Sequence, residues 1–222
     1  MATPTLSKQN FLNKEIKLQK EYRVLVTGAN GFIGGAMYSH LQNKAVDGYQ
    51  VIGYDLRVED NFEPNIEFVK QIIEANRINV VMHFGAISST AEKDIDKVLR
   101  FNYDFTKDLV DFCYEKGILL QFSSSASVYG NKNTTFKETD IPNPQSPYAI
   151  SKYLCERYIM DKIMNDGAMI QAFRYFNVYS FSLGKMLEEH KGNQASPYCK
   201  FYISLLNDQK IKLFYGSENY KR

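Results

Sequence analysis

The sequence predicts a doubly wound α/β domain, in which helices cover both faces of a parallel sheet. Short, almost entirely apolar runs alternate with longer amphipathic stretches, and strands of this kind are typical of sheets buried on both faces. The connections are long enough for helices, which right-handed crossovers place on the two faces. With 222 residues and 44% hydrophobic content, the chain can bury one sizeable core.

The elements alternate strictly along the chain. The first is RVLVT, a β-branched run that breaks into glycines before a helical pattern begins. The predicted strands cover residues 23–27, 50–55, 79–84, 118–123 and 169–176. The predicted helices cover residues 32–43, 68–77, 95–116 and 148–164. A surface loop rich in Asn, Thr and Pro is expected over 131–147.

Three parts of the chain are expected to differ in role. Residues 1–21 mix lysines with a few apolar residues and predict a flexible leader without the apolar core of a secretory signal. Residues 22–180 carry the alternating elements and are expected to form a dinucleotide-binding domain with the catalytic residues. Residues 181–222 are expected to form a partial substrate-binding lobe.

Composition and charge exclude several classes of protein. The net charge of +2 comes from 27 basic and 25 acidic residues without a basic stripe, so neither nucleic acid nor a membrane surface is a predicted partner. The longest apolar stretch, 78–87, is about half the ~20 residues that a membrane-spanning helix needs. We therefore expect a cytoplasmic protein.

The cysteines and histidines carry no recognisable site. Cys113, Cys155 and Cys199 are widely spaced and read as free thiols of a reducing compartment. The histidines His40, His83 and His190 are far apart and have no metal-ligand spacing, so no metal is expected.

A glycine-rich turn between the first strand and first helix predicts dinucleotide binding. Gly28, Gly31 and Gly34 permit a tight turn, let the backbone approach a pyrophosphate, and leave the amides at the helix N-terminus free to bind it. Asp55 ends the next strand, about 20 residues on, where a carboxylate can accept both ribose hydroxyls of an adenosine. Arg57 could instead face a 2′-phosphate or lie in solvent. We expect NAD, with NADP as the alternative.

Two further segments indicate acid–base chemistry. Tyr148 and Lys152 are one helical turn apart on one face, where an ammonium would favour the phenolate and lower the pKa of the tyrosine toward the working pH. Ser123, Ser124 and Ser125 end the preceding strand, at the edge of the sheet where doubly wound folds bind ligands. Each signal is weak alone, but the three segments in this order are jointly specific.

These segments together resemble the extended short-chain dehydrogenases/reductases that act on nucleotide sugars. The resemblance spans residues 23–222 and rests on TGANGFIG, HFGAISS, FSSSASVYG, PYAISK and RYFNVY. It implies a Rossmann-type fold and a catalytic triad of Ser125, Tyr148 and Lys152. It also implies cofactor contacts from Gly28, Gly31, Phe32, Ile33, Gly34, Asp55, Tyr148, Lys152 and Val178, with Gly85, Ala86 and Asn102 lining the nicotinamide half.

Two later segments are similar to those of the heptose 6-epimerases within this family, namely HKGNQAS at 190–196 and KLFYGSENYKR at 212–222. The resemblance implies that Lys191 is a second catalytic base that acts opposite Tyr148. In this arrangement one group removes the hydroxyl proton as hydride leaves to the cofactor, and the other returns a proton after the ketone has presented its other face. The substrate, a nucleotide sugar such as ADP-heptose, would be held by Ser125, Asn177, Asn193, Phe214, Ser217 and Arg222.

The chain also departs from the family pattern. Residues 56–67 are too few for the usual third strand and its acidic residue on the adenine side, unless 66–69 serves as a strand stub, so weaker adenine binding is expected. After Tyr179 the family's Gly-Pro-Arg is replaced by Ser180, Phe181 and Ser182. The chain stops before the family's last core strand, so we expect a C-terminally truncated substrate lobe.

Other functions remain open at this stage. FSSSASVYG and PQSPY look equally like a UDP-hexose 4-epimerase, and a sugar-nucleotide dehydratase shares the same elements. A catalytically idle nucleotide-binding fragment is supported only by the truncation. A homo-oligomer is compatible with the sequence.

Overall fold

The computed structural model describes residues 21–43, 49–55, 63–90, 92–131, 135–179 and 197–211. They form a five-stranded parallel sheet in the order β2-β1-β3-β4-β5. The strands are β1 (Tyr22–Thr27), β2 (Tyr49–Tyr54), β3 (Val80–His83), β4 (Leu119–Ser125) and β5 (Ile170–Tyr175). The chain crosses from one side of β1 to the other between β2 and β3, and this reversal opens a crevice at the carboxyl ends of the strands.

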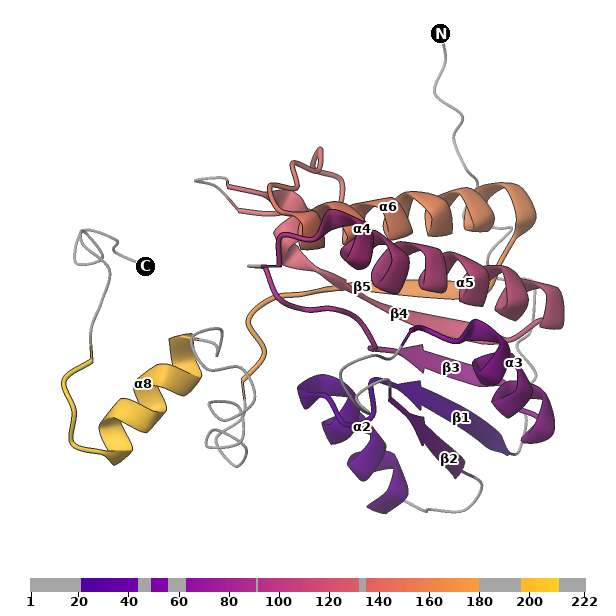
Figure 1. Ribbon diagram of the computed structural model, residues 1–222, viewed down its shortest axis with the longest axis horizontal. Coiled ribbons are helices and arrows are strands. Elements are labelled where there is room, and N and C mark those ends of the chain that lie inside the picture. The colour runs from indigo at the N-terminus through magenta and orange to yellow at the C-terminus, as the bar shows by residue number, and fades with distance from the viewer. Residues whose placement is uncertain are drawn as a thin grey trace, which may run out of the picture.

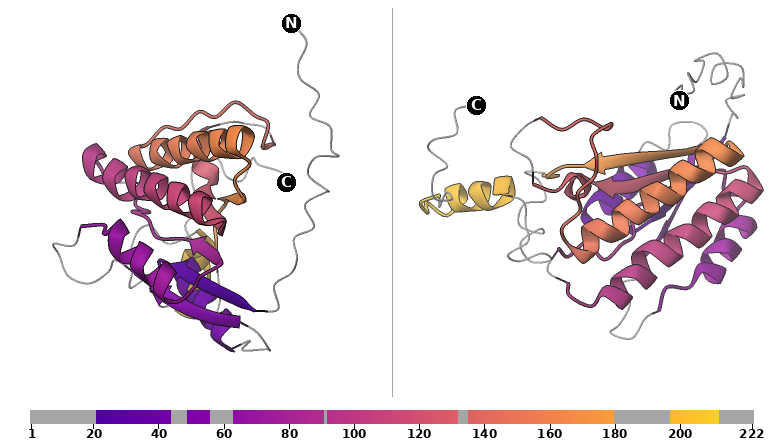
Figure 2. Two further views of the ribbon diagram at one scale, coloured as in Figure 1. Left: turned by 90° about the vertical axis from the view of Figure 1, so that its right-hand side faces the viewer. Right: turned by 90° about the horizontal axis from the view of Figure 1, so that it is seen from above.

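Helices cover both faces of the sheet, as the sequence predicts (Figures 1 and 2). The helix α2 (Phe32–Asn43) packs on one face over β1, where Tyr38 and Leu41 contact a small core that includes Val24 and Val26. The larger core lies on the other face, beneath α3 (Ile66–Ala75), α5 (Phe105–Lys116) and α6 (Pro147–Asp161). The doubly wound α/β fold is therefore confirmed.

The predicted helix over 95–116 is interrupted by a change of helical type. It consists of α4 (Ile95–Val98), the π-helical segment η1 (Leu99–Asp104) and α5, and it ends at Gly117 in the left-handed conformation with φ 65°. Similarly, α6 passes into a second π-helical segment, η3 (Lys162–Asp166). Such π segments are rare and frequently lie at functional sites.

The suggested strand stub over 66–69 is wrong, because these residues form the first turn of α3. The side chain of Asn65 accepts a hydrogen bond from the Phe68 amide at 2.9 Å and so caps the helix. This cap stabilises a helix start two residues before the predicted one. Within the described residues, β2 is an edge strand and no strand follows it before β3.

One further helix follows the sheet. The helix α8 (Pro197–Leu206) lies apart from the sheet in Figure 1, and the Tyr179 and Tyr198 rings are in contact with centroids 4.9 Å apart. No helix in the described ranges is both long and apolar enough to cross a membrane. Residues 1–20, assigned to the leader, lie outside the described residues.

Cys113 and Cys155 are buried free thiols, and burial raises their pKa values to about 12 and about 11.

Candidate active site

A cavity of about 710 Å³ opens at the carboxyl ends of the strands, a size typical of ligand pockets. It brings together three segments that are far apart in the sequence: the glycine turn after β1, the loop after β3, and the strand end of β4 with the start of α6. The sequence-predicted site residues that line it are Gly28, Gly31, Phe32, Ile33, Gly34, Asp55, Gly85, Ala86, Ser125, Tyr148, Lys152, Asn177 and Val178.

The glycine turn is shaped so that only glycine fits at two of its positions. Gly28 has φ +71°, and a Cβ there would stand 2.7 Å from the Gly85 amide nitrogen. A Cβ on Gly34 would overlap the carbonyl oxygen of Gly28. The turn therefore packs directly against the loop after β3 and keeps its backbone open to the cavity, which suits the pyrophosphate of a dinucleotide.

Asp55 is held beside this turn. Its Oδ2 accepts a hydrogen bond from the Asn30 amide at 2.6 Å, and the Ala29 amide donates to the carbonyl of Tyr54 at 3.2 Å. These bonds join the end of β2 to the glycine turn. In dinucleotide-binding folds a carboxylate at this place binds the adenosine ribose, so the residues present fit a nicotinamide dinucleotide.

The hydroxyl groups of Ser125 and Tyr148 meet at the other end of the cavity. Ser125 ends β4. Its Oγ accepts two hydrogen bonds from Ser127, one from the backbone amide at 3.1 Å and one from the side-chain hydroxyl at 2.9 Å. Tyr148 stands in the first turn of α6, which Ser146 caps by accepting a bond from the Ala149 amide at 3.2 Å. Burial raises the pKa of Tyr148, while a side-chain hydrogen bond with Ser125 acts in the opposite direction.

The expectation that Lys152 lowers the pKa of Tyr148 is wrong for this structure. The Lys152 Nζ lies 6.0 Å from the centroid of the Tyr148 ring and donates instead to the carbonyl of Ser123 at 2.7 Å. The side chain is only 3% exposed and lies over the Phe122 ring at 4.7 Å. Burial lowers the pKa of Lys152 to about 8, against the opposing effects of Cys155 and Glu156.

An ion pair behind the strand end is a feature that sequence reasoning missed. Glu156 accepts from Arg174 Nε at 2.9 Å and from Nη2 at 2.7 Å, and it also accepts from the Ser124 hydroxyl at 2.5 Å. Hydrogen bonding to Glu156 raises the pKa of Arg174, whose guanidinium lies 4.5 Å from the Tyr129 ring. The Ser124 hydroxyl thus ties β4 to the Glu156–Arg174 pair of α6 and β5. The only sequence signal was the one-turn spacing of Glu156 from Lys152.

Asn102 lies behind the cavity wall rather than on it. It is 1% exposed in η1, and its amide group pairs with both backbone groups of Ile87, accepting from N at 2.8 Å and donating to O at 3.1 Å. It also donates to Ser151 Oγ at 3.0 Å, which donates to the Tyr148 carbonyl at 2.8 Å. Asn102 therefore joins the loop after β3 to the start of α6.

His83 forms part of the cavity floor. Its Nδ1 lies 2.6 Å from Thr27 Oγ1 and its Nε2 lies 3.0 Å from Thr106 Oγ1. Burial, and secondarily the charge of Lys152, lower the pKa of His83 to about 3, so it is neutral at physiological pH. Among the described residues, no group of three or more acidic, histidine or cysteine side chains could hold a metal ion.

The remaining predicted residues lie outside the described residues. They are Lys191, Asn193, Phe214, Ser217 and Arg222. The assignment of these residues therefore stays a prediction.

The chain matches a known protein family and is similar to several solved structures. The profile of the NAD dependent epimerase/dehydratase family matches residues 24–219. Among solved structures, the chain is similar to UDP-glucose 4-epimerase from Thermotoga maritima in complex with UDP-glucose, with a TM-score of 0.72 and 26% identity over 88% of this chain and 67% of that one. It is also similar to the UDP-glucose 4-epimerase of Thermus thermophilus in complex with NAD, with a TM-score of 0.62 and 28% identity over 71% of this chain and 56% of that one.

A third similar structure is the ADP-L-glycero-D-manno-heptose-6-epimerase of Helicobacter pylori. The TM-score is 0.72 at 22% identity, over 84% of this chain and 63% of that one. At this identity the likeness shows the fold. The chain thus spans less than two thirds of the length of two of these three structures.

Proposed function

Because the chain belongs to the NAD dependent epimerase/dehydratase family, we propose that it epimerises a nucleotide sugar by transient oxidation and reduction at one sugar carbon, with NAD as its cofactor. One observation carries the proposal. Ser125 and Tyr148 line the same cavity as the glycine turn and Asp55, so a sugar hydroxyl and a dinucleotide can meet there.

NAD, when bound, supplies the hydride acceptor and donor at the sugar carbon. The proton of the sugar hydroxyl is transferred by residues of the chain itself. Tyr148 exchanges this proton with the sugar hydroxyl, and Ser125 shares a hydrogen bond with the same oxygen. Lys152 is held by the Ser123 carbonyl at the end of β4. Burial raises the pKa of Tyr148, and the side-chain hydrogen bond with Ser125 acts in the opposite direction and so favours the phenolate when the proton leaves.

The substrate we propose is ADP-heptose, inverted at carbon 6. The support is the similarity of the segments 190–196 and 212–222 to heptose 6-epimerases, with Lys191 as the second base and Asn177, Asn193, Phe214, Ser217 and Arg222 as substrate contacts. In this proposal residues 22–180 form the cofactor unit and 181–222 contribute to the substrate lobe. An Arg222 guanidinium suits a phosphate of the substrate.

A UDP-hexose 4-epimerase is the second candidate. The two solved UDP-glucose 4-epimerases named above share 26% and 28% identity with this chain, which exceeds the 22% of the heptose enzyme. An enzyme of this kind needs a single acid–base tyrosine, because the sugar turns within the site. Lys191 would then have no catalytic role.

Turnover by single-residue variants separates these possibilities. The protein is incubated with ADP-heptose and, separately, with UDP-glucose, and chromatography measures the epimer formed. Tyr148→Phe should lower turnover about 10²–10⁴-fold while NAD binding, measured by calorimetry, stays within about twofold. Lys191→Ala should lower turnover similarly with ADP-heptose.

Full activity of Lys191→Ala would instead favour the single-base 4-epimerase. If the unaltered chain binds NAD but converts neither sugar nucleotide, the epimerase proposal is contradicted. A dehydratase would reveal itself by loss of water from the sugar in the same chromatograms.

A further inference from the structure

The hydroxyl group of Tyr54 is buried without a partner. Tyr54 is the last residue of β2 and is 8% exposed, yet its oxygen has no hydrogen bond within the described ranges, the only such buried side-chain atom found there. A phenol hydroxyl loses its hydrogen bonds to water on burial, which destabilises the folded state when nothing replaces them. Buried polar groups nearly always have partners, so an exception calls for a physical reason.

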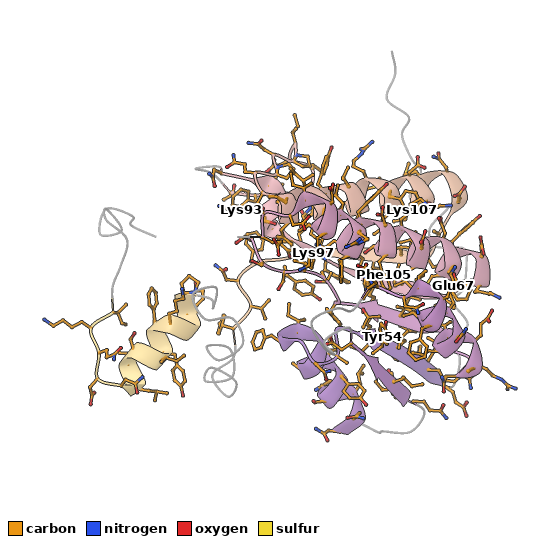
Figure 3. The ribbon with its side chains drawn as sticks, viewed as in Figure 1. Tyr54, Glu67, Lys93, Lys97, Phe105 and Lys107 are labelled. Atoms are coloured by element: carbon orange, nitrogen blue, oxygen red, sulfur yellow. The ribbon has the colours of Figure 1, made fainter. Side chains whose placement is uncertain are left out.

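The position of Tyr54 points to that reason. Tyr54 immediately precedes Asp55, and both residues line the main cavity together with Phe105. Figure 3 labels Tyr54 and Phe105. In doubly wound folds the carboxylate that ends the second strand binds the ribose of the adenosine half, and the nicotinamide half extends in the opposite direction. Tyr148 and Lys152 lie at that opposite end, on the far side of β3. Tyr54 is therefore a residue of the adenosine end.

The surroundings hold the ring in place. The Phe68 ring of α3 packs against it with centroids 6.0 Å apart at 50°, and the Tyr54 carbonyl accepts a hydrogen bond from Ala29 in the glycine turn. Burial, and secondarily Asp55, raise the pKa of Tyr54, so the hydroxyl keeps its proton and can both donate and accept. Among the described residues, no further strand pairs with β2 at this edge of the sheet.

We propose that the Tyr54 hydroxyl is a hydrogen-bonding group for the adenosine half of the cofactor, beside the ribose contact of Asp55. This inference rests on the proposed function only in taking NAD as the ligand. It explains why a hydroxyl is kept at a place where phenylalanine would fill the same space without a desolvated oxygen.

Tyr54→Phe tests the proposal because it removes the oxygen alone. Calorimetry should show binding of NAD and of ADP-ribose, which contains the adenosine half, weakened about five- to tenfold. Binding of nicotinamide mononucleotide, which lacks this half, should stay within about twofold. The thermal midpoint without nucleotide should rise, since the variant no longer buries an unpaired hydroxyl.

Tyr158→Phe is the matched control. This hydroxyl lies outside the cavity and already donates to Asp111 Oδ1 at 2.5 Å, so its removal should leave nucleotide binding unchanged and should not raise the midpoint. Unaltered binding of NAD and ADP-ribose by Tyr54→Phe would overturn the proposal, and so would an equal loss for all three ligands. Failure of the unaltered protein to bind NAD would count against the proposed function instead.

Discussion

The Asp55 carboxylate is the residue on which the choice of cofactor depends. It accepts a hydrogen bond from the Asn30 amide and faces the cavity. A carboxylate there binds a free 2′-hydroxyl and repels a 2′-phosphate. Asp55→Ala should therefore weaken binding of NAD by about tenfold or more and binding of NADP much less.

Titration calorimetry with both dinucleotides checks this. Asp55→Asn is the matched variant, because it keeps an acceptor for the Asn30 amide but removes the charge. It should raise the affinity for NADP relative to NAD. An equal loss for both cofactors in both variants would show that Asp55 does not meet the ribose.

Lys152 should reduce the stability of the protein at neutral pH. Its pKa is about 8 in the folded chain and 10.5 as the ordinary value, so the unfolded state binds the proton more tightly. The shift corresponds to roughly 3–4 kcal/mol, of which the lost bond to Ser123 offsets about 1 kcal/mol. Lys152→Met should accordingly raise the free energy of unfolding at pH 7 by about 2–3 kcal/mol while abolishing turnover.

The stability advantage of Lys152→Met over the unaltered protein should depend on pH in one direction. The charge penalty is fully present below pH 8 and disappears as the pH rises toward 10.5, so the advantage of Lys152→Met should fade over that range in urea unfolding. Lys97, an exposed residue of α4 labelled in Figure 3, provides the control variant Lys97→Met, which should show no such trend. A constant difference between pH 7 and 11 would contradict the prediction.

At the scale of the elements, one ion pair holds the end of β4 in position. Glu156 of α6 binds Arg174 of β5 through two hydrogen bonds and also receives the Ser124 hydroxyl, and the two charged side chains are 12% and 16% exposed. Removing one partner leaves the other charge buried. Glu156→Ala should therefore lower the free energy of unfolding by about 3–5 kcal/mol.

The neutral double variant Glu156→Gln/Arg174→Met should recover most of this loss, because no buried charge is left unpaired. Chemical denaturation of the three proteins gives the comparison. If the double variant is as unstable as Glu156→Ala, the packing of these side chains, rather than their charge, holds the strand end.

For the whole molecule, His83 should set part of the acid sensitivity. Thr27, Thr106, Lys152 and two aromatic rings surround the imidazole, and its pKa of about 3 lies well below the ordinary 6.5. The contribution of His83 to the free energy of unfolding is then fully present above pH 6.5 and is lost as the pH drops toward 3, by on the order of 5 kcal/mol. His83→Gln should lose less stability than the unaltered protein over this range.

Acid unfolding followed by circular dichroism measures this slope. The exposed His40 of α2 supplies the control, and His40→Gln should follow the unaltered protein. If His83→Gln and the unaltered protein lose stability equally as the pH falls, groups other than His83 dominate acid unfolding.

Local sequence determined the fold class, the glycine turn and the order of the candidate site residues. Apolar strands, a turn that only Gly28 and Gly34 permit, and a Tyr-Lys spacing of one helical turn are each written within a few residues. Parallel pairing then places every strand end at one edge, so Asp55 and Ser125 face one cavity without further information.

Only the tertiary structure decided which of these groups face each other and which are desolvated. The Glu156–Arg174 pair joins residues 18 apart, and the contact of Thr27 with His83 joins residues 56 apart. The hydrogen bond of Ser124 to Glu156, the raised pKa of Tyr148 and the unpaired hydroxyl of Tyr54 all depend on such distant neighbours. Burial and hydrogen-bond pairing are properties of the packed chain, because desolvation is set by every element that closes over a group.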